Sequence, residues 1–357
     1  MQQYLQATKQ PTLILLDEVN YIPDWDRAIK YLADSGFLAQ TSLILSGSNS
    51  LIIQEAMKRF PGRRGKAAQI NFHYYPLNFH EFVQLRSKAQ KHSISELYQH
   101  FSVYLKTGGY LTAINELENE LEKDKKISWA TLNTYREWIF GDFLSYRKSE
   151  RSLHEIIESI LIRYGTQITW NALAKELSID HHKTVAEYCE LLVHMDAAFI
   201  QSALEEHTLR AAPKKARKIY FSDPFIFHAL SSFVWGSEKP WEENIKTVEE
   251  KPYLSNLIEG IVVNHCRRFF PTYYIKAQQE IDLAVVIETK IYPIEVKWTN
   301  QLRGHDFQQL KKYKNAIIAG KVFENFLLDG INTIPLPVLL YSIDKLPELQ
   351  DWEKVPK

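Results

Sequence analysis

Apolar positions near the start of the chain follow the pattern of an α/β sheet. The run Leu13–Leu16, which ends at Asp17-Glu18, has the four consecutive aliphatic residues typical of a buried parallel strand. Helical spacing from Trp25 to Leu32 follows, and a second apolar run at Leu43–Leu45 leads into a polar turn and a helix from about Leu51. The pattern predicts a strand, a helix, a second strand and a second helix.

Helical spacing dominates the middle of the chain. The segment from Tyr98 to Leu105 predicts a helix that stops at Gly108-Gly109. After Ser152 the pattern predicts three helices and two strands, at residues 153–162, 170–177, 181–195, 197–202 and 219–221. Three closely spaced helices followed by a hairpin are typical of a winged helix-turn-helix.

The last third of the chain returns to a mixed α/β pattern. It predicts a helix at 254–268 and strands at 273–276, 280–287 and 291–298. An amphipathic stretch at 305–315 predicts a further helix on the sheet. The segment 334–341 predicts a closing edge strand, because prolines are tolerated at strand starts.

Composition narrows the class of protein. A chain of 357 residues is long enough for two or three domains, and 45% hydrophobic with 24% charged residues is ordinary for a soluble globular protein. Its 43 basic and 43 acidic residues cancel, so nucleic-acid binding requires a local patch. Cys189 and Cys266 are too few for a disulfide framework, which favours a cytoplasmic location. No apolar run approaches the roughly 20 residues that cross a bilayer, so no membrane contact is expected.

The acidic pair Asp17-Glu18 is the first candidate for chemistry. In P-loop ATPases a carboxylate at this strand end holds the Mg²⁺ shell, and the next one orients the attacking water. Such a site also needs Gly-x-x-x-x-Gly-Lys-Ser/Thr upstream to cradle the phosphates. Only 12 residues precede Leu13, and none is glycine. The chain therefore carries half of a nucleotide site.

Two further loops supply candidate nucleotide contacts. Ser46 and Asn49 follow the second strand, where such side chains either touch a γ-phosphate or only cap the next helix. Arg63 and Arg64 lie in a basic loop, where an arginine either neutralises transition-state charge or is simply solvated.

Four motifs in this order resemble the AAA+-type P-loop ATPases of bacteria and archaea whose C-terminal half is a domain of unknown function. The motifs are Leu-Leu-Asp-Glu-Val-Asn-Tyr-Ile-Pro-Asp-Trp at 15–25, Leu-Ser-Gly-Ser-Asn-Ser at 45–50, Pro-Gly-Arg-Arg-Gly-Lys at 61–66 and Tyr-Pro-Leu-Asn-Phe-His-Glu-Phe at 75–82. The resemblance covers nearly the whole chain. It implies that Asp17 and Glu18 are the Walker B pair, with Asp17 a metal ligand, that Ser46 to Asn49 form the sensor-1 turn, and that Arg63 or Arg64 is the arginine that follows it.

The resemblance also shows what this sequence lacks. The P-loop strand and helix of the family would lie before residue 1, so the chain is either a truncated member or one that has lost nucleotide binding. ATP and Mg²⁺ are the cofactors that the family implies. We expect no ATP hydrolysis by this chain alone, and nucleotide binding by it is in doubt.

The winged-helix segment offers candidate contacts to DNA. Lys183 and Thr184 would stand at the start of the third helix, where recognition helices meet base edges. Four basic residues of the wing would lie on phosphates: Lys214, Lys215, Arg217 and Lys218. The alternative is a winged helix used for protein packing, since Asp180 and Glu187 weaken the positive field.

Acidic residues of the last third resemble the core of a PD-(D/E)xK nuclease. Side chains alternate along strands, so Glu295 and Lys297 share one face. On this resemblance Asp282 and Glu295 would bind Mg²⁺, Lys297 would position the attacking water, and Glu259 would complete the site from its helix. The alternative is a cross-strand charge pattern on a half-exposed sheet. The same spacing recurs in the ATPase family named above.

These expectations define a multidomain α/β protein. The expected regions are a partial AAA+ ATPase core at 1–88, a helical lid at 89–150, a winged helix at 151–218, and a restriction-endonuclease-like α/β domain of unknown function at 219–357. Three functions follow: an ATPase homologue associated with nucleic acid, a Mg²⁺-dependent nuclease, and a non-catalytic assembly or regulatory protein. The expected partners are DNA, another protein or a second copy of the chain.

Overall fold

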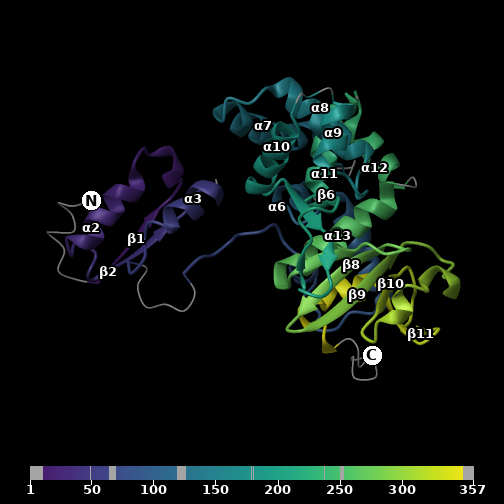
Figure 1. The fold of residues 1–357 in the computed structure, drawn as a ribbon. Helices are drawn as coiled ribbons and strands as arrows, with labels where there is room; N and C mark the ends of the chain where they lie inside the picture. Colours follow the sequence, from purple (N-terminus) through teal and green to yellow (C-terminus); the bar gives the residue numbers. More distant parts are fainter. Residues whose placement is uncertain are drawn as a thin grey trace. The chain divides into compact units, whose positions relative to one another are not determined.

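A computed structural model gives the fold. It describes residues 11–48, 50–63, 70–118, 126–177, 179, 181–236, 238–249 and 253–348. The chain divides into two compact units, one of residues 1–74 with 194–196 and one of residues 75–193 with 197–357 (Figure 1). Each unit is described by itself below.

The smaller unit is built on two parallel strands, as the sequence predicts. β1 (Thr12–Leu16) pairs with β2 (Thr41–Leu45), and α2 (Trp25–Asp34) and α3 (Ser50–Met57) pack with them. Burial of the strands was predicted wrongly, because Leu13 and Leu15 are exposed. Side chains alternate along a strand, so only every second residue faces the core that these helices provide.

Helices form the first part of the larger unit. They are α4 (Phe79–Arg86), α5 (Ile94–Thr107), α6 (Leu111–Leu117), α7 (Trp129–Ser145), α8 (Glu150–Ile162), α9 (Trp170–Glu176), α10 (His182–His194), α11 (Pro224–Trp235), α12 (Pro240–Glu249) and α13 (Tyr253–Phe269). The apolar helix α11 packs against α5, α7, α8 and α12, and its first nine residues are buried. The predicted helices at 153–162, 170–177 and 181–195 are confirmed as α8, α9 and α10.

A short ribbon links the helical part to the C-terminal sheet. β3 (Ala198–Ser202) and β6 (Arg217–Phe221) are antiparallel, and the register places Gln201 opposite Lys218. Ile168 forms a bridge with Arg217, which adds a third segment to this ribbon. A small hairpin of β4 (Leu204–Glu205) and β5 (Arg210–Ala211) lies between β3 and β6 in the sequence.

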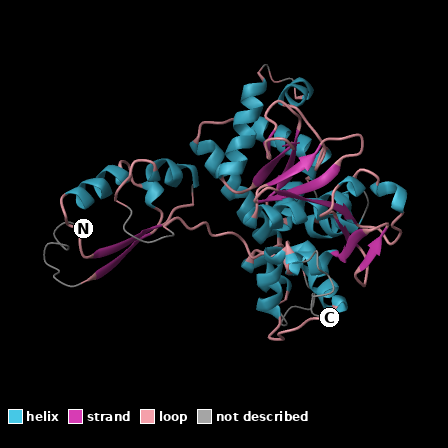
Figure 2. Ribbon diagram, turned by 60° about the horizontal axis from the view of Figure 1, so that its bottom comes forward, coloured by secondary structure: helices cyan, strands magenta, loops and turns pink. Residues whose placement is uncertain are grey.

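A six-stranded sheet forms the C-terminal part of the larger unit (Figure 2). Its strand order is β11 (Phe326–Leu328), β12 (Ile331–Pro335), β10 (Ile317–Gly320), β9 (Lys290–Lys297), β8 (Ile281–Ile287) and β7 (Thr272–Ile275). The strands β7, β8 and β9 form an antiparallel meander, whereas β10 is parallel to both β9 and β12. α13 packs against the ribbon and this meander.

Two predicted elements near the C-terminus are wrong. Residues 305–315 form the 3₁₀ turns η2 (Gly304–Phe307) and η3 (Leu310–Lys312) rather than an α-helix, and buried Phe307 and Leu310 have the three-residue spacing of such turns. The segment 334–341 ends the internal strand β12 and then forms α14 (Leu336–Tyr341). Proline suits the first turn of a helix, and Leu336, Leu339 and Leu340 have the burial spacing of a helix.

No helix within the described ranges is long and apolar enough to cross a membrane.

Candidate functional site

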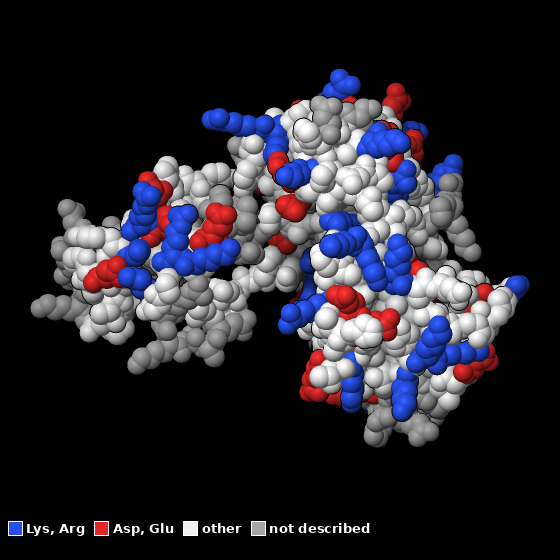
Figure 3. All heavy atoms as spheres, in the orientation of Figure 1, with Lys and Arg blue, Asp and Glu red and all other residues white. Residues whose placement is uncertain are grey.

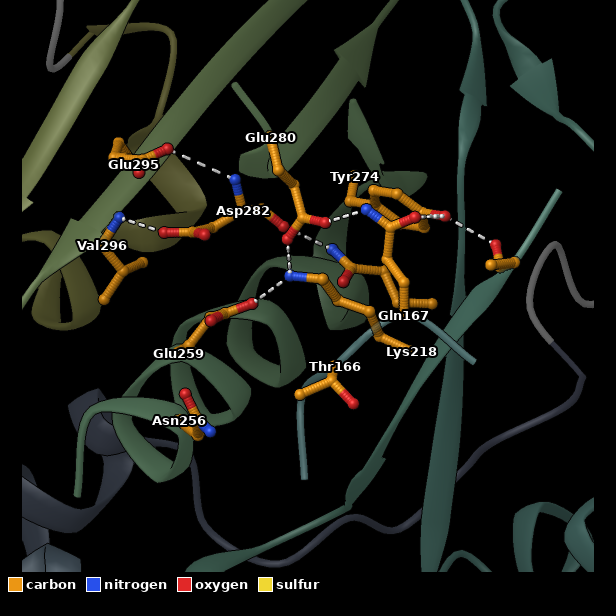
Figure 4. Close-up of polar contacts among 12 residues, drawn as sticks. Thr166, Gln167, Lys218, Asn256, Glu259, Tyr274, Glu280, Asp282, Glu295 and Val296 are labelled. Atoms are coloured by element: carbon orange, nitrogen blue, oxygen red, sulfur yellow. Dashed lines mark hydrogen bonds and ion pairs between the residues drawn. The ribbon is translucent and has the colours of Figure 1, made fainter. Parts of the chain in front are cut away.

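Four carboxylates from different elements meet beside the antiparallel meander (Figure 4). Glu259 projects from α13, Glu280 directly precedes β8, Asp282 lies in β8, and Glu295 lies in β9. One oxygen atom from each of Glu259, Glu280 and Asp282 lies within 4.8 Å of the others. Alternation along the strand brings Glu280 and Asp282 to one face, and the helix packed against that face adds Glu259.

Two lysines enter this carboxylate centre. Lys218 Nζ from β6 lies 2.7 Å from Glu259 Oε1 and also pairs with Glu280, and Figure 4 shows it between the two. Lys297 Nζ lies 2.7 Å from Glu295 Oε1. The Lys218 side chain is only 2% exposed, whereas that of Lys297 is 36% exposed. When all are ionised, two ammonium groups leave two of the four negative charges without a cation.

Hydrogen bonds fix the orientation of the carboxylates. The backbone N–H of Val296 donates to Asp282 Oδ2 at 2.9 Å, and the N–H of Asp282 donates to Glu295 Oε2 at 3.4 Å. The Tyr220 hydroxyl donates to Glu259. The Gln167 amide donates to Glu280. Adjacent strands and the ribbon therefore hold the acidic side chains in place.

The electrostatics of the centre follow from its burial. Desolvation, followed by repulsion from Asp282, raises the pKa values of Glu259 and Glu295 above the usual range. Desolvation also raises the pKa of Asp282, although Lys218 and Lys297 oppose this shift. Burial acts to lower the pKa of both lysines, but the facing carboxylates outweigh it and raise them. Negative charge thus remains in excess.

The residues present fit a divalent cation. Carboxylate oxygens are the hard ligands that Mg²⁺ prefers, and an excess of negative charge with little access to water favours a bound cation. A bound Mg²⁺ would polarise a phosphoryl oxygen and activate a water molecule. Of the residues described, Asp282 and Glu295, with Glu259 and Glu280 beside them, are the ones that would hold it.

The structure brings together every residue that the sequence assigns to this centre. Glu259, Asp282, Glu295 and Lys297 all lie within it. Sequence reasoning missed Glu280, although its two-residue spacing from Asp282 was the available signal. It also placed Lys218 wrongly on the surface of the wing. Lys218 is buried because it alternates with Arg217 along β6 and shares the inner face with Tyr220.

The acidic pair of the smaller unit lies at the ends of β1 and β2. The Ser46 hydroxyl donates to Asp17 Oδ1. Ser48 Oγ and the Ser48 N–H donate to Glu18 Oε2 at 3.0 and 3.3 Å. Parallel strands bring their carboxyl ends to one edge of a sheet, which is why the two loops meet. Glu18 has a left-handed backbone, with φ of 51°.

The remaining nucleotide candidates divide in two. Arg63 is engaged with Asp34 at the end of α2 through Nε and Nη2, the latter at 3.0 Å from Oδ2. This contact holds the pKa of Asp34 below its usual range. Asn49 and Arg64 lie outside the described residues.

The candidate DNA contacts do not form one block of positive charge. Lys183, Lys214 and Lys215 are exposed, while Thr184 is half-buried. The Arg217 guanidinium lies over the Trp170 ring, 4.5 Å from its centroid. Figure 3 shows Lys and Arg interleaved with Asp and Glu on the visible face of the larger unit. Glu187 on α10 pairs with Lys148 at 2.7 Å, and Asp180 lies outside the described residues.

Comparisons with known proteins agree with the resemblance at both ends of the chain. Residues 1–83 match the family described as an AAA domain. Residues 98–236 match a domain of unknown function, DUF8612, and residues 254–338 match another, DUF4143. The AAA and DUF4143 matches together indicate an ATPase-type protein.

A relative with a similar arrangement gives no further information on activity. An uncharacterized protein of Methanocaldococcus jannaschii is 25% identical over 365 residues, which cover 94% of this chain and 70% of that protein. No solved structure matches the chain significantly.

Proposed function

We propose that this chain is an ATPase-type protein associated with nucleic acid whose own chemistry is Mg²⁺-dependent cleavage of phosphodiester bonds at the carboxylate centre. The observation that carries this proposal is the meeting of Glu259, Asp282 and Glu295 with Lys297 beside an excess of negative charge. The carboxylates would hold the ion, and the partly exposed Lys297 would orient water or stabilise charge on the phosphate. The fold and spacing of a PD-(D/E)xK nuclease account for all four residues.

Cleavage of plasmid DNA tests this proposal. We expect the full chain to nick supercoiled plasmid in Mg²⁺ but not in EDTA, and Lys297→Ala to lower the rate by about 10²-fold or more. Lys290→Ala is the matched control, because Lys290 begins the same strand and is exposed. Equal cleavage by the wild type and Lys297→Ala would point to a contaminating nuclease. Absence of cleavage would favour the non-catalytic assembly or regulatory function.

We further propose that Asp17 and Glu18 are the Walker B pair and that this chain does not hydrolyse ATP by itself. The contacts from Ser46 and Ser48 support a nucleotide-type edge, since they join the acidic pair to the loop where a γ-phosphate would lie. The 357 residues contain no Gly-x-x-x-x-Gly-Lys-Ser/Thr. Phosphate release from Mg-ATP should therefore equal that of Glu18→Gln. Turnover that Glu18→Gln abolishes would contradict the proposal.

The ribbon and the three helices before it support contact with duplex DNA as a winged helix. Helices α8, α9 and α10 followed by antiparallel β3 and β6, with the bridge at Ile168, have the order of that motif. Lys214 and Lys215 would contact phosphates, so Lys214→Ala with Lys215→Ala should reduce the salt slope of DNA binding by about 2. Binding of wild type that is insensitive to salt, or no binding, would favour a protein-packing module.

A further inference from the structure

Lys218 has an environment unlike that of an ordinary surface lysine. Its side chain is 2% exposed, and its Nζ contacts Glu259 and Glu280 together. The same nitrogen lies 5.6 Å from the centroid of the Tyr274 ring. A buried ammonium is costly unless carboxylates compensate it, so Lys218 and these two glutamates stabilise one another.

Lys218 and a neighbouring amide reach the centre from the same ribbon. Gln201 on β3 lies opposite Lys218 on β6, and both are 2% exposed. Gln201 Nε2 donates to the backbone oxygen of Asp282 at 2.9 Å. The ribbon therefore docks against the carboxylate centre through two buried polar side chains, and Lys218 is held there by secondary structure rather than by a mobile loop.

The two lysines divide the centre into unequal halves. Glu259 and Glu280 surround Lys218, which has almost no contact with solvent. Asp282 and Glu295 lie on the other side, next to Lys297, whose side chain is 36% exposed. An entering cation can displace Lys297 toward solvent, but it cannot displace Lys218 without leaving a buried ammonium unpaired.

We infer that Lys218 takes the position of a second metal ion, so that the centre binds a single divalent cation between Asp282 and Glu295. Two buried ammonium groups and one divalent ion balance the four carboxylates, whereas a second divalent ion would leave positive charge in excess. This inference rests on the proposed function of the centre. Lys218 acts as a positioning residue, supplied by the region before the DUF4143 match.

Manganese binding to the full chain tests the inference without measuring activity. In calorimetric titration with Mn²⁺ we expect one ion per chain for the wild type, and the bound Mn²⁺ should give the spectrum of an isolated ion in electron paramagnetic resonance. Lys218→Met should bind two ions, because it frees Glu259 and Glu280 for a second cation. Lys215→Met, on the exposed wing, should bind one.

The outcomes separate the inference from the proposed function. Two ions in the wild type, or exchange-coupled Mn²⁺ in its spectrum, would overturn the inference and leave the metal centre standing. No bound Mn²⁺ would overturn the proposed function itself. One ion in folded Lys218→Met would also overturn the inference. Should Lys218→Met not fold, the wild-type count decides the matter, with Lys218→Arg expected to keep one ion.

Discussion

Buried carboxylates dominate the energetics of individual residues. The Glu259 and Glu295 side chains are 12% and 10% exposed, so their ionised forms lose most of the stabilisation that water gives. Lys218 and Lys297 return part of it. The part not returned appears as raised carboxyl pKa values, and a site of this kind gains stability from either protons or a divalent cation.

Stability should therefore fall with pH when metal is removed. Burial and repulsion from Asp282 raise the pKa of Glu295 to about 8, against an ordinary value of 4.5, so the folded chain retains a proton that the unfolded chain releases. Stability from this proton is complete below pH 4.5 and is lost as the pH rises through about 8. Between pH 6.5 and 8.5 in EDTA we expect losses of up to about 1.4 kcal/mol per pH unit for each retained proton.

Urea denaturation at several pH values measures this slope. Glu295→Gln should flatten it, because glutamine does not titrate. Glu288→Gln, in the exposed turn before β9, should leave it unchanged. A wild-type slope of zero, or one that rises with pH, would show that the centre carries no excess negative charge.

At the scale of elements, the end of α5 shows how one glycine couples two helices. Gly108 follows Thr107, the last residue of α5, and has φ of 52°. A Cβ at this position would lie 1.6 Å from Asp223 Oδ1. Asp223 caps α11 through the N–H of Phe225 at 2.8 Å and accepts the N–H of Gly109 at 3.0 Å. The close approach of Gly108 thus lets one buried carboxylate hold both helices.

Replacement of this glycine should be strongly destabilising. Gly108→Ala combines a left-handed φ with a clash against a buried carboxylate, for which we expect a loss of about 3 kcal/mol or more in the free energy of unfolding. Gly141→Ala is the matched control: Gly141 lies within α7, and a Cβ there meets no atom within 4 Å. It should gain about 0.5–1 kcal/mol in urea denaturation. Equal effects of the two substitutions would refute this role of Gly108.

Strong periodicity made most elements predictable from the sequence. The helices at 153–162, 170–177 and 254–268 were recognised because each has an apolar stripe of helical spacing. The alternation of Glu280, Asp282, Glu295 and Lys297 likewise placed most of the centre. Residues 305–315 were misread because a three-residue spacing resembles a helical one. The segment 334–341 was misread because prolines suit both strand starts and helix starts.

The role of Lys218 could not be read from its neighbours in sequence. It stands in a run with Lys214, Lys215 and Arg217, and five of the nine residues from 210 to 218 are basic, which is the composition of a solvated wing. Only tertiary contact with Glu259 on α13 and with Glu280 ahead of β8 distinguishes it. Burial of a cation depends on where distant carboxylates arrive, and sequence patterns do not give that position.

At the scale of the whole molecule, the two candidate sites belong to different compact units. The acidic pair Asp17-Glu18 lies in the smaller unit, and the carboxylate centre lies entirely in the larger one. The centre draws on residues from Gln167 to Lys297. Its integrity therefore depends on the helical part and the sheet together, but on no residue before position 75.

A chain that begins at residue 75 should thus retain the carboxylate centre. We expect it to bind Mn²⁺ with an affinity within about threefold of the full chain, since every carboxylate and both lysines are present. A chain of residues 253–348 should bind Mn²⁺ more weakly, because it lacks Lys218, Gln201 and the ribbon that carries them. Loss of binding in the chain from residue 75 would mean that the smaller unit contributes to the centre.

The most direct test of the account is the shift of thermal unfolding caused by Mg²⁺ at pH 8 and at pH 5, at constant ionic strength. A ligand that binds only the folded state stabilises it by RT ln(1 + [L]/Kd), and protons compete with the metal for raised-pKa carboxylates. The account predicts a Tm that rises with the logarithm of Mg²⁺ concentration at pH 8, less at pH 5, and hardly at all in Asp282→Asn. A wild-type Tm that is the same in Mg²⁺ and in EDTA at both pH values would contradict it.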